Sequence, residues 1–351
     1  MTNKPLRLAD YGWSQFFQSQ LSPADFARFH PVRVFAVHRN GLDVAGADFD
    51  GRVPPFCDGD DDEARATVGD WLLVDRASGA PERVLLRKSL FKRQAAGTAR
   101  RVQLIAANVD TLFIVTSCNQ DFNVARLERY LALAREADVT PLIVLTKADL
   151  AEDAHAYVTR AARLMPGLLV ECLDARAADQ VVHLKPWCGT GQTVALVGSS
   201  GVGKSTLVNT LTGGDLLTRP IREDDAHGRH TTSGRALYSL AAGGLLMDTP
   251  GMRELQLADA GSGIDDVFAD IVALAAKCRF ADCSHDSEPG CAVQAALADG
   301  SLDAARYTRY LKLVREDAYN SAALHERRAR DRDFGRMVKG VMKAKNARRG
   351  I

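Results

Sequence analysis

The chain has no long apolar run, no excess of charge of one sign and no internal repeat. None of its apolar stretches approaches the roughly 18 residues that a membrane-spanning helix needs, which excludes a protein anchored by such helices. The N-terminal segment has no apolar stretch of the kind found in secretory signals, so we expect a cytoplasmic protein without membrane contact. The 45 basic and 44 acidic residues leave a net charge of +1, which gives no overall nucleic-acid signature.

Length and composition indicate an ordered globular chain of several domains. At about 150 residues per domain, the 351 residues predict two or three domains. The seven cysteines are an odd number, and three of them crowd into residues 278–291. This pattern favours a metal site in a reducing compartment over a disulfide framework.

Charge is balanced overall but not locally. Seven basic residues and no acidic residue occur between Arg83 and Val109, namely Arg83, Arg87, Lys88, Lys92, Arg93, Arg100 and Arg101. A second basic block begins at His325 and runs to the C-terminus. Two such blocks predict a polyanionic partner, although each alone is also typical of a solvated surface. The acidic run at 58–63 is predicted to be an exposed loop, because charges this dense repel each other.

Short strands predict a small β-barrel over residues 30–102. The segment 32–46 alternates in part and contains Asn40-Gly41, a pair that supplies the positive φ angles of a two-residue hairpin turn. Residues 68–75 and 83–86 read as further strands.

Strand and helix patterns alternate after this point. Strands are predicted at 109–117, 141–146, 168–172 and 193–197, with helices at 124–137 and 152–164. This alternation is typical of a parallel sheet covered on both faces. Helices are predicted at 264–276 and 301–316, the second with Ser301 as its N-cap.

Residues 198–205 match the phosphate-loop pattern G-x-x-x-x-G-K-[ST] in full. A strand precedes the motif and a helix-forming segment follows it, so a chance match is disfavoured. Backbone N–H groups would surround a phosphate, Lys204 would reach the β- and γ-phosphates, and Ser205 would ligate Mg²⁺. The candidate phosphate-binding residues are Gly198, Ser199, Ser200, Gly201, Val202, Gly203, Lys204, Ser205 and Thr206.

Two further motifs predict the other nucleotide contacts. Asp248 and Gly251 belong to a D-x-x-G motif, in which the Asp holds Mg²⁺ through water and the Gly N–H meets the γ-phosphate. Thr146, Lys147 and Asp149 belong to a T-K-x-D motif at the end of another strand. The carboxylate would accept N1–H and N2–H of guanine, a pair of donors that adenine lacks, which argues against an ATPase. Thr in place of the usual Asn is expected to remove a tie to the phosphate loop.

The order of the motifs is unusual. In ordinary GTPases the base-reading motif follows the phosphate loop and D-x-x-G, whereas here T-K-A-D precedes both. The sequence therefore predicts a circularly permuted GTPase fold. The segment after D-x-x-G, which senses the γ-phosphate, would then run directly into the C-terminal region.

Cys278, Cys283, His285 and Cys291 supply three thiolates and one imidazole. A closed set of four such ligands is typical of structural zinc. Free thiols and catalytic Cys-His chemistry are the alternatives.

These motifs together resemble the ribosome small-subunit-dependent GTPase A family. The residues that carry the resemblance are VGDW (68–71), AANVD (106–110), TKAD (146–149), GSSGVGKST (198–206), GRHTTS (228–233), DTPG (248–251) and CRFADCSHDSEPGCAV (278–293). The family usually has a third Thr where this chain has Ser233, and the acidic run at 58–63 is a second departure.

The resemblance implies a multidomain protein. Its parts would be an N-terminal OB-fold RNA-binding domain (1–102), a permuted α/β GTPase domain (103–263) and a mainly α-helical zinc-binding domain with a basic tail (264–351). It implies GTP hydrolysis to GDP during late maturation of the 30S subunit, stimulated by that subunit, with contacts to 16S rRNA. We expect one structural Zn²⁺, Mg²⁺ with GTP, and a monomer. A GTP-gated RNA-binding module, a tRNA-directed GTPase and a metal-handling chaperone are the alternatives.

The segment 228–233 is expected to carry the catalytic switch. Thr231 or Thr232 would ligate Mg²⁺ when GTP is bound. Met252 stands where many small GTPases have a water-orienting Gln, so intrinsic hydrolysis is predicted to be slow. His230 would orient or deprotonate the attacking water; packing or contact with RNA is its alternative role.

Overall fold

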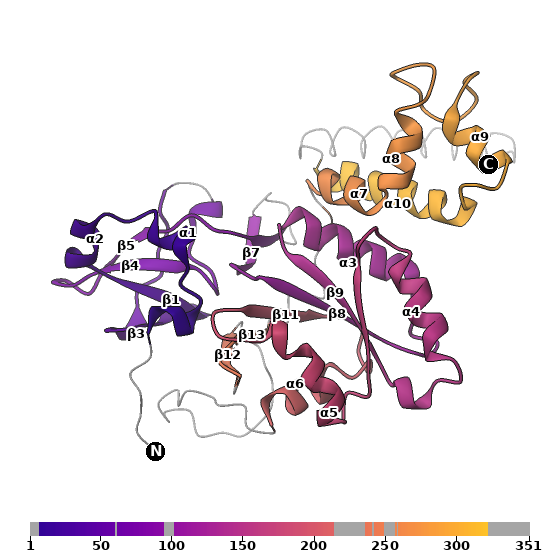
Figure 1. Ribbon diagram of the computed structural model, residues 1–351. Coiled ribbons are helices and arrows are strands. Elements are labelled where there is room, and N and C mark those ends of the chain that lie inside the picture. Colours follow the sequence, from indigo (N-terminus) through magenta and orange to yellow (C-terminus); the bar gives the residue numbers. More distant parts are fainter. Residues whose placement is uncertain are drawn as a thin grey trace, which may run out of the picture.

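A computed structural model describes residues 7–59, 62–94, 102–213, 236–240, 242–248, 257 and 259–321. One sheet of 11 strands runs through the N-terminal and central regions (Figure 1). Its strands follow the order β10-β9-β8-β11-β13-β12-β1-β2-β3, and β4 pairs with β1 and β5. The two regions meet where β1 pairs with β12 at Ala36 and Ala236.

The N-terminal region is antiparallel. Short helices η1 (Leu8–Tyr11), α1 (Gln15–Gln18) and α2 (Pro23–Arg28) precede the strands β1 (Phe29–His38), β2 (Gly41–Gly46), β3 (Asp50–Val53), β4 (Trp71–Asp75) and β5 (Pro81–Val84), with the 3₁₀ helix η2 (Asp62–Ala64) between β3 and β4. β6 (Leu90–Gln94) and β7 (Val102–Ala107) form a separate two-stranded sheet that the sequence did not predict.

The first hairpin is confirmed, but the turn predicted at Asn40-Gly41 lies one residue earlier in the chain. His38 pairs with Gly41, so the turn residues are Arg39 and Asn40. Asn40 and Gly41 both have negative φ. Gly41 is needed for space instead, since a Cβ there would lie 2.9 Å from the carbonyl oxygen of Val53.

The central region is a mostly parallel sheet with helices on both faces. Its elements in chain order are β8 (Thr111–Ser117), α3 (Val124–Glu136), β9 (Thr140–Thr146), η3 (Ala148–Leu150), α4 (Ala154–Ala162), β10 (Leu169–Cys172), α5 (Ala178–Val181), η4 (Val182–Trp187), β11 (Thr193–Val197), α6 (Lys204–Thr212), β12 (Ala236–Ser239) and β13 (Leu245–Asp248). Helices α3 and α4 cover one face, and α5 and α6 cover the other (Figure 1).

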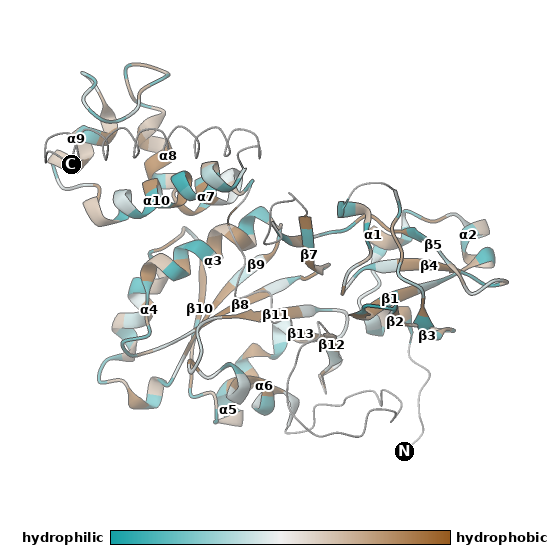
Figure 2. Cartoon of the chain, turned by 180° about the vertical axis from the view of Figure 1, so that it is seen from behind, coloured by the Kyte–Doolittle hydropathy of each residue, from teal (hydrophilic) through white to brown (hydrophobic). Residues whose placement is uncertain are grey.

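The predicted strands and the two predicted helices of this region are confirmed to within a few residues. All seven residues of β8 are buried, because helices cover it on both sides. Hydrophobic residues accordingly run along the strands in Figure 2, whereas α3 and α4 also carry polar residues. The sequence missed β12, which joins the central strands to β1.

The C-terminal region is helical, with α7 (Gly261–Val267), α8 (Ala269–Ala275), α9 (Ala292–Ala298) and α10 (Ala304–Ser321). The single helix predicted at 264–276 is two helices, interrupted at the buried Phe268, whose backbone is not helical (φ −108°, ψ 35°). Ser301 does not cap α10. Asp303 does so, because its carboxylate accepts the N–H groups of Ala305 (3.0 Å) and Arg306 (3.2 Å).

A buried cation joins the N-terminal region to the central region. Arg33 of β1 is 1% exposed. Its guanidinium donates to the carbonyl oxygens of Gly69 (2.7 Å), Tyr11 (2.8 Å) and Asn108 (2.9 Å) and to Thr193 Oγ1 (3.2 Å). Burial lowers the pKa of Arg33 to about 10, so the side chain stays charged at neutral pH.

A buried anion joins the central region to the C-terminal helices. The Glu128 side chain on α3 has no exposed surface. It accepts from Arg306 Nη1 (3.2 Å) and Arg309 Nε (2.6 Å), both on α10. Burial raises the pKa of Glu128, and the hydrogen bond from Arg309 opposes this effect. The contact therefore holds α3 against α10.

The first basic block is largely neutralised within the chain. Arg87 binds Asp70 (Nε to Oδ1, 2.7 Å), and Lys92 Nζ lies 2.7 Å from Glu63 Oε1. Lys88 Nζ lies 3.7 Å from Asp110. Arg100 and Arg101 lie outside the described residues. Arg87, Lys88 and Lys92 are therefore each paired with an acidic group of the same chain.

The prediction of an exposed loop holds for Asp58, which is exposed, whereas Asp62 and Glu63 are partly buried in the 3₁₀ helix η2. Glu63 pairs with Lys92, and Asp58 Oδ2 accepts the N–H of Val84 (3.0 Å). Asp62 Oδ2 accepts the N–H of Val102 (3.3 Å). Cations and backbone donors of neighbouring segments compensate the repulsion that the local sequence suggests.

Candidate functional site

The predicted nucleotide motifs meet at one edge of the central sheet. Strands β10, β9, β8, β11 and β13 are parallel, so their carboxyl ends share an edge. The phosphate loop follows β11, the T-K-A-D motif begins at the last residue of β9, and Asp248 ends β13. Binding at the carboxyl edge of parallel strands is the usual arrangement in open α/β sheets.

The phosphate loop has the backbone geometry that its glycines allow. Gly198, Gly201 and Gly203 have φ angles of 145°, 79° and 95°. At Gly198 a Cβ would lie 2.2 Å from the carbonyl oxygen of Val115, so a side chain cannot fit there. Lys204 opens α6, and its Nζ donates to the carbonyl oxygens of Gly198 (2.8 Å) and Ser199.

The other loop residues divide into surface and core positions. Ser200, Gly201, Ser205 and Thr206 are exposed. Val202 is completely buried, so its side chain packs in the core and only its backbone is available to a ligand.

Thr146 ties the base-reading motif to the phosphate loop. Its buried hydroxyl lies 2.6 Å from the carbonyl oxygen of Val202 and 3.2 Å from that of Thr116. The expectation that Thr loses the tie made by the usual Asn is therefore wrong. The hydroxyl is sufficient because it reaches the carbonyl oxygen of Val202 directly.

Asp149 lies at the surface, in the short helix η3 that follows Lys147. Its Oδ2 accepts from Arg176 Nη2 at 2.7 Å. Sequence reasoning missed Arg176. The one available signal was its position shortly after the strand 168–172, at the edge that carries the other motifs.

Arg126 is a second residue that the sequence did not single out. It lies in the first turn of α3, and its Nη1 donates to Ser199 Oγ in the phosphate loop. The same helix carries Glu128, which α10 holds. Helix α3 therefore contacts both the phosphate loop and the C-terminal helices.

The catalytic switch lies outside the described residues. This applies to His230, Thr231 and Thr232, and to Gly251 of the D-x-x-G motif. Of Asp248, only the backbone is described, as the last residue of β13.

The predicted metal ligands come together in the C-terminal region. The ligand atoms of Cys278, Cys283, His285 and Cys291 all lie within 4.8 Å of one another. Cys278 Sγ and Cys291 Sγ are 3.8 Å apart, and each lies 3.5 Å from His285 Nδ1. A tetrahedral zinc ion with ordinary bond lengths separates two sulfurs by about 3.8 Å and a sulfur and a nitrogen by about 3.5 Å. The donor set and its spacing fit zinc.

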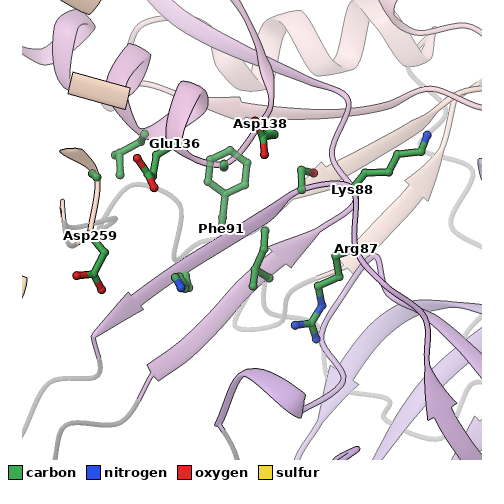
Figure 3. Close-up of a pocket in the computed structure, with 12 residues that line it drawn as sticks. Arg87, Lys88, Phe91, Glu136, Asp138 and Asp259 are labelled. Carbon is green, nitrogen blue, oxygen red and sulfur yellow. The ribbon is translucent and has the colours of Figure 1, made fainter. Parts of the chain in front are cut away.

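A cavity of about 330 Å³ lies away from both sites, where three parts of the chain meet. Arg87, Lys88 and Phe91 come from the segment at β6, Glu136 from the end of α3, and Asp259 precedes α7. Figure 3 shows Arg87 and Lys88, which lie in the loop before β6, pointing away from each other. None of the predicted nucleotide or metal ligands lines this cavity. Among the described residues, no helix combines the length and apolar character that crossing a membrane requires.

Comparisons with known proteins agree with this arrangement. The pattern of the RsgA GTPase family matches residues 84–258. A Vibrio parahaemolyticus protein named small ribosomal subunit biogenesis GTPase RsgA 2 is 49% identical over 99% of this chain and 95% of its own length. A Mesorhizobium japonicum protein named small ribosomal subunit biogenesis GTPase RsgA is 54% identical over 90% of this chain and 91% of its own.

Two solved structures share the fold. The structure of YloQ, described as a circularly permuted GTPase, is 25% identical and aligns with a TM-score of 0.58 over 84% of this chain and 97% of its own. The structure of YjeQ from Thermotoga maritima aligns with a TM-score of 0.57 at 24% identity, over 81% and 97%. The fold and the phosphate-loop edge define a circularly permuted P-loop GTPase. Within that class, the chain belongs to the RsgA GTPase family.

Proposed function

We propose that this GTPase binds GTP with Mg²⁺ at the carboxyl edge of the central sheet and hydrolyses it to GDP and phosphate. We further propose that it acts as a nucleotide-gated factor in late maturation of the small ribosomal subunit and that the 30S particle stimulates it. The names of the relatives support this role. The observation that carries the nucleotide assignment is the hydrogen bond from Thr146 to Val202, which joins the base-reading and phosphate-binding motifs into one site.

Each motif residue has a role in this proposal. The loop 198–203 and Lys204 bind the phosphates, and Lys147 and Asp149 bind the guanine. Ser205, Asp248 and one of Thr231 and Thr232 would hold Mg²⁺, which supplies positive charge to the phosphates when it is bound. Gly251 would donate its N–H to the γ-phosphate.

We also propose how the chain meets its partner. An OB-fold over 1–102 and a basic tail would contact 16S rRNA, with the GTPase over 103–263 and the zinc-bearing helices from 264 to 351. The antiparallel pairing of β1 with β2 and β4 supports an OB-like N-terminal domain. Since Arg87 and Lys92 are occupied by acidic partners, we assign the larger share of the phosphate contacts to the tail. We propose a monomer that works in the cytoplasm, where small subunits mature.

GTP hydrolysis by the purified protein, alone and with 30S subunits, tests this proposal. We expect slow turnover alone, a strong rise with 30S, and no turnover of ATP. Turnover that 30S leaves unchanged would contradict the assigned partner. It would favour a GTP-gated RNA-binding module or a tRNA-directed GTPase, which other RNAs in the same assay would separate.

Replacing His230 by Ala tests its proposed role toward the attacking water. We expect the 30S-stimulated kcat to fall by about 100-fold, the usual contribution of a positioned acid or base. The Kd for GTP should change less than twofold, because His230 would act on water and not on the nucleotide. An unchanged kcat would remove His230 from the mechanism.

The metal site is proposed to hold one structural zinc ion. Elemental analysis should find one zinc per chain in the native protein and none in a Cys283→Ser variant. The variant should lose helical circular dichroism at a lower temperature, because the largely exposed segment 278–290 between α8 and α9 depends on its metal. Cys57, which is exposed and lies far from the cluster in sequence, is the matched control. Full zinc content in Cys283→Ser would contradict the assignment.

A further inference from the structure

Arg176 lies between two carboxylates at the edge of the nucleotide site. Its Nε and Nη2 each lie 3.0 Å from an oxygen of Asp174, and Nη2 also lies 2.7 Å from Asp149 Oδ2. The backbone N–H of Arg176 donates to Asp174 Oδ1 as well (3.0 Å). The guanidinium is therefore held by Asp174 and directed at Asp149.

These contacts leave the carboxylate of Asp149 able to accept guanine. An ionised carboxylate has about four lone-pair sites on two oxygens. Arg176 occupies one site on Oδ2. The other oxygen and the second site on Oδ2 remain for the two N–H groups on the edge of guanine.

The charges also favour recognition of guanine. Asp174 neutralises Arg176, and the hydrogen bond from Arg176 lowers the pKa of Asp174 below its usual value. The trio of Asp149, Asp174 and Arg176 therefore keeps a net charge of −1. A negatively charged acceptor strengthens the hydrogen bonds from the two N–H donors of guanine.

The segment that carries Arg176 is fixed to the helix of the phosphate loop. Thr210 of α6 donates its hydroxyl to the carbonyl oxygen of Ala175 (2.7 Å). Gln180 Oε1 accepts the N–H of Asp174 (2.8 Å). Arg176 is thus presented from a loop whose position is tied to α6, the helix that begins at Lys204.

We propose that Arg176 is a positioning residue for guanine specificity. It fixes the plane of the Asp149 carboxylate, so that one oxygen meets N1–H and the other meets the 2-amino group. This inference rests on the proposed function, in which Asp149 reads the base. It adds a specificity determinant, supplied by the loop after β10, to the T-K-A-D motif.

The test compares the binding of GDP and IDP to the full-length protein. Hypoxanthine lacks the 2-amino group, so the ratio of the two Kd values reports the second hydrogen bond. We expect Arg176→Ala to weaken GDP about fivefold, as expected for one hydrogen bond, and IDP less than twofold. Arg176→Lys should restore part of the ratio, because an ammonium also donates to Oδ2. Arg163→Ala, an exposed arginine at the end of α4, should match the wild type.

The variant Asp149→Asn tests whether Asp149 binds guanine, separately from whether Arg176 positions Asp149. Xanthine carries an oxygen where guanine has its 2-amino group, so an amide at 149 should favour XDP over GDP. If Asp149→Asn keeps the preference for GDP, the base assignment itself fails. If Asp149→Asn changes the preference but Arg176→Ala leaves the GDP/IDP ratio unchanged, only the inference on Arg176 is overturned. Tighter GDP binding by Arg176→Ala would also overturn it, since Arg176 would then compete with the base.

Discussion

The central region meets each of its neighbours through a buried charge, but the two charges are compensated differently. At the N-terminal junction, Arg33 donates to three main-chain carbonyls and a hydroxyl. At the C-terminal junction, Glu128 is held by the side chains of Arg306 and Arg309. A buried ion pair between side chains can be replaced as a set by apolar residues. Main-chain carbonyls cannot be removed by substitution. The charged group and its partners at the Arg33 junction therefore cannot be replaced together by apolar residues.

Replacing Arg33 by Leu should have the largest effect. The carbonyls of Gly69, Tyr11 and Asn108 would each lose the donor that Arg33 supplies, although Gly69 keeps Asn108 Nδ2 at 2.9 Å. A buried polar group that loses its partner costs about 1–3 kcal/mol. We expect the free energy of unfolding to fall by about 4 kcal/mol or more, measured from urea unfolding followed by tryptophan fluorescence. Arg33→Lys is the control. An ammonium on one stem cannot span partners on separate segments, so it should recover little of the loss. Recovery of most of it would contradict the comparison.

Replacing Glu128 by Gln should destabilise the protein by about 3 kcal/mol, because an amide has one acceptor oxygen, whereas Arg306 and Arg309 each donate to a different oxygen of Glu128. The double variant Glu128→Leu, Arg309→Met should recover most of this loss, since Arg306 keeps Asp270 as a partner at 2.8 Å. The readout is the midpoint of urea unfolding. A double variant as unstable as the single one would remove the distinction between the two junctions.

The pH dependence separately measures what the buried charge on Glu128 costs. Burial raises the pKa of Glu128 above its usual 4.5. A carboxyl group with a raised pKa contributes stability that is fully present below pH 4.5 and is lost as the pH rises through the folded-state value. Wild-type stability should therefore fall across this range relative to Glu128→Gln, which has no proton to lose.

Replacing Arg135 by Ala should have the smallest effect, at the same C-terminal junction. Arg135 pairs with Asp266 at 2.7 Å, but both side chains are about half exposed, at 45% and 48%. Exposed ion pairs contribute about 0.2–1 kcal/mol, and salt should remove the difference from wild type. A loss as large as that of Glu128→Gln, measured in the same unfolding assay, would show that burial does not separate these two pairs.

The parts of the fold and site that sequence predicts are those with short-range signatures. The strand at 193–197, the loop up to Ser205 and the T-K-A-D motif are each continuous in sequence. The Cys/His cluster also lies within 14 residues, 278–291. The parallel order of the strands then follows from their alternation with helices, which brings these motifs to one edge.

The remaining features depend on segments that are distant in sequence. The tie made by Thr146 needs Val202, 56 residues away, and Arg126 meets Ser199 across 73 residues. Arg176 acts on a residue 27 positions earlier. Lys92 of the basic block likewise pairs with Glu63 of the acidic run. In the sequence alone, each of these segments carries charge of one sign and shows no partner. No local pattern contains these partners. The sequence therefore predicts the motifs but not the distant residues that hold the motifs in place.

The spread of partners around Arg33 also sets an order of events during synthesis. Arg33 and its partner Thr193 are 160 residues apart, whereas Tyr11 and Gly69 lie within 36 residues of it. At about 5–20 residues per second, the ribosome delivers Thr193 roughly 8–32 s after Arg33. The N-terminal strands therefore emerge with a charged side chain that is only partly satisfied. Its burial is completed when β11, the strand that leads into the phosphate loop, has left the exit tunnel.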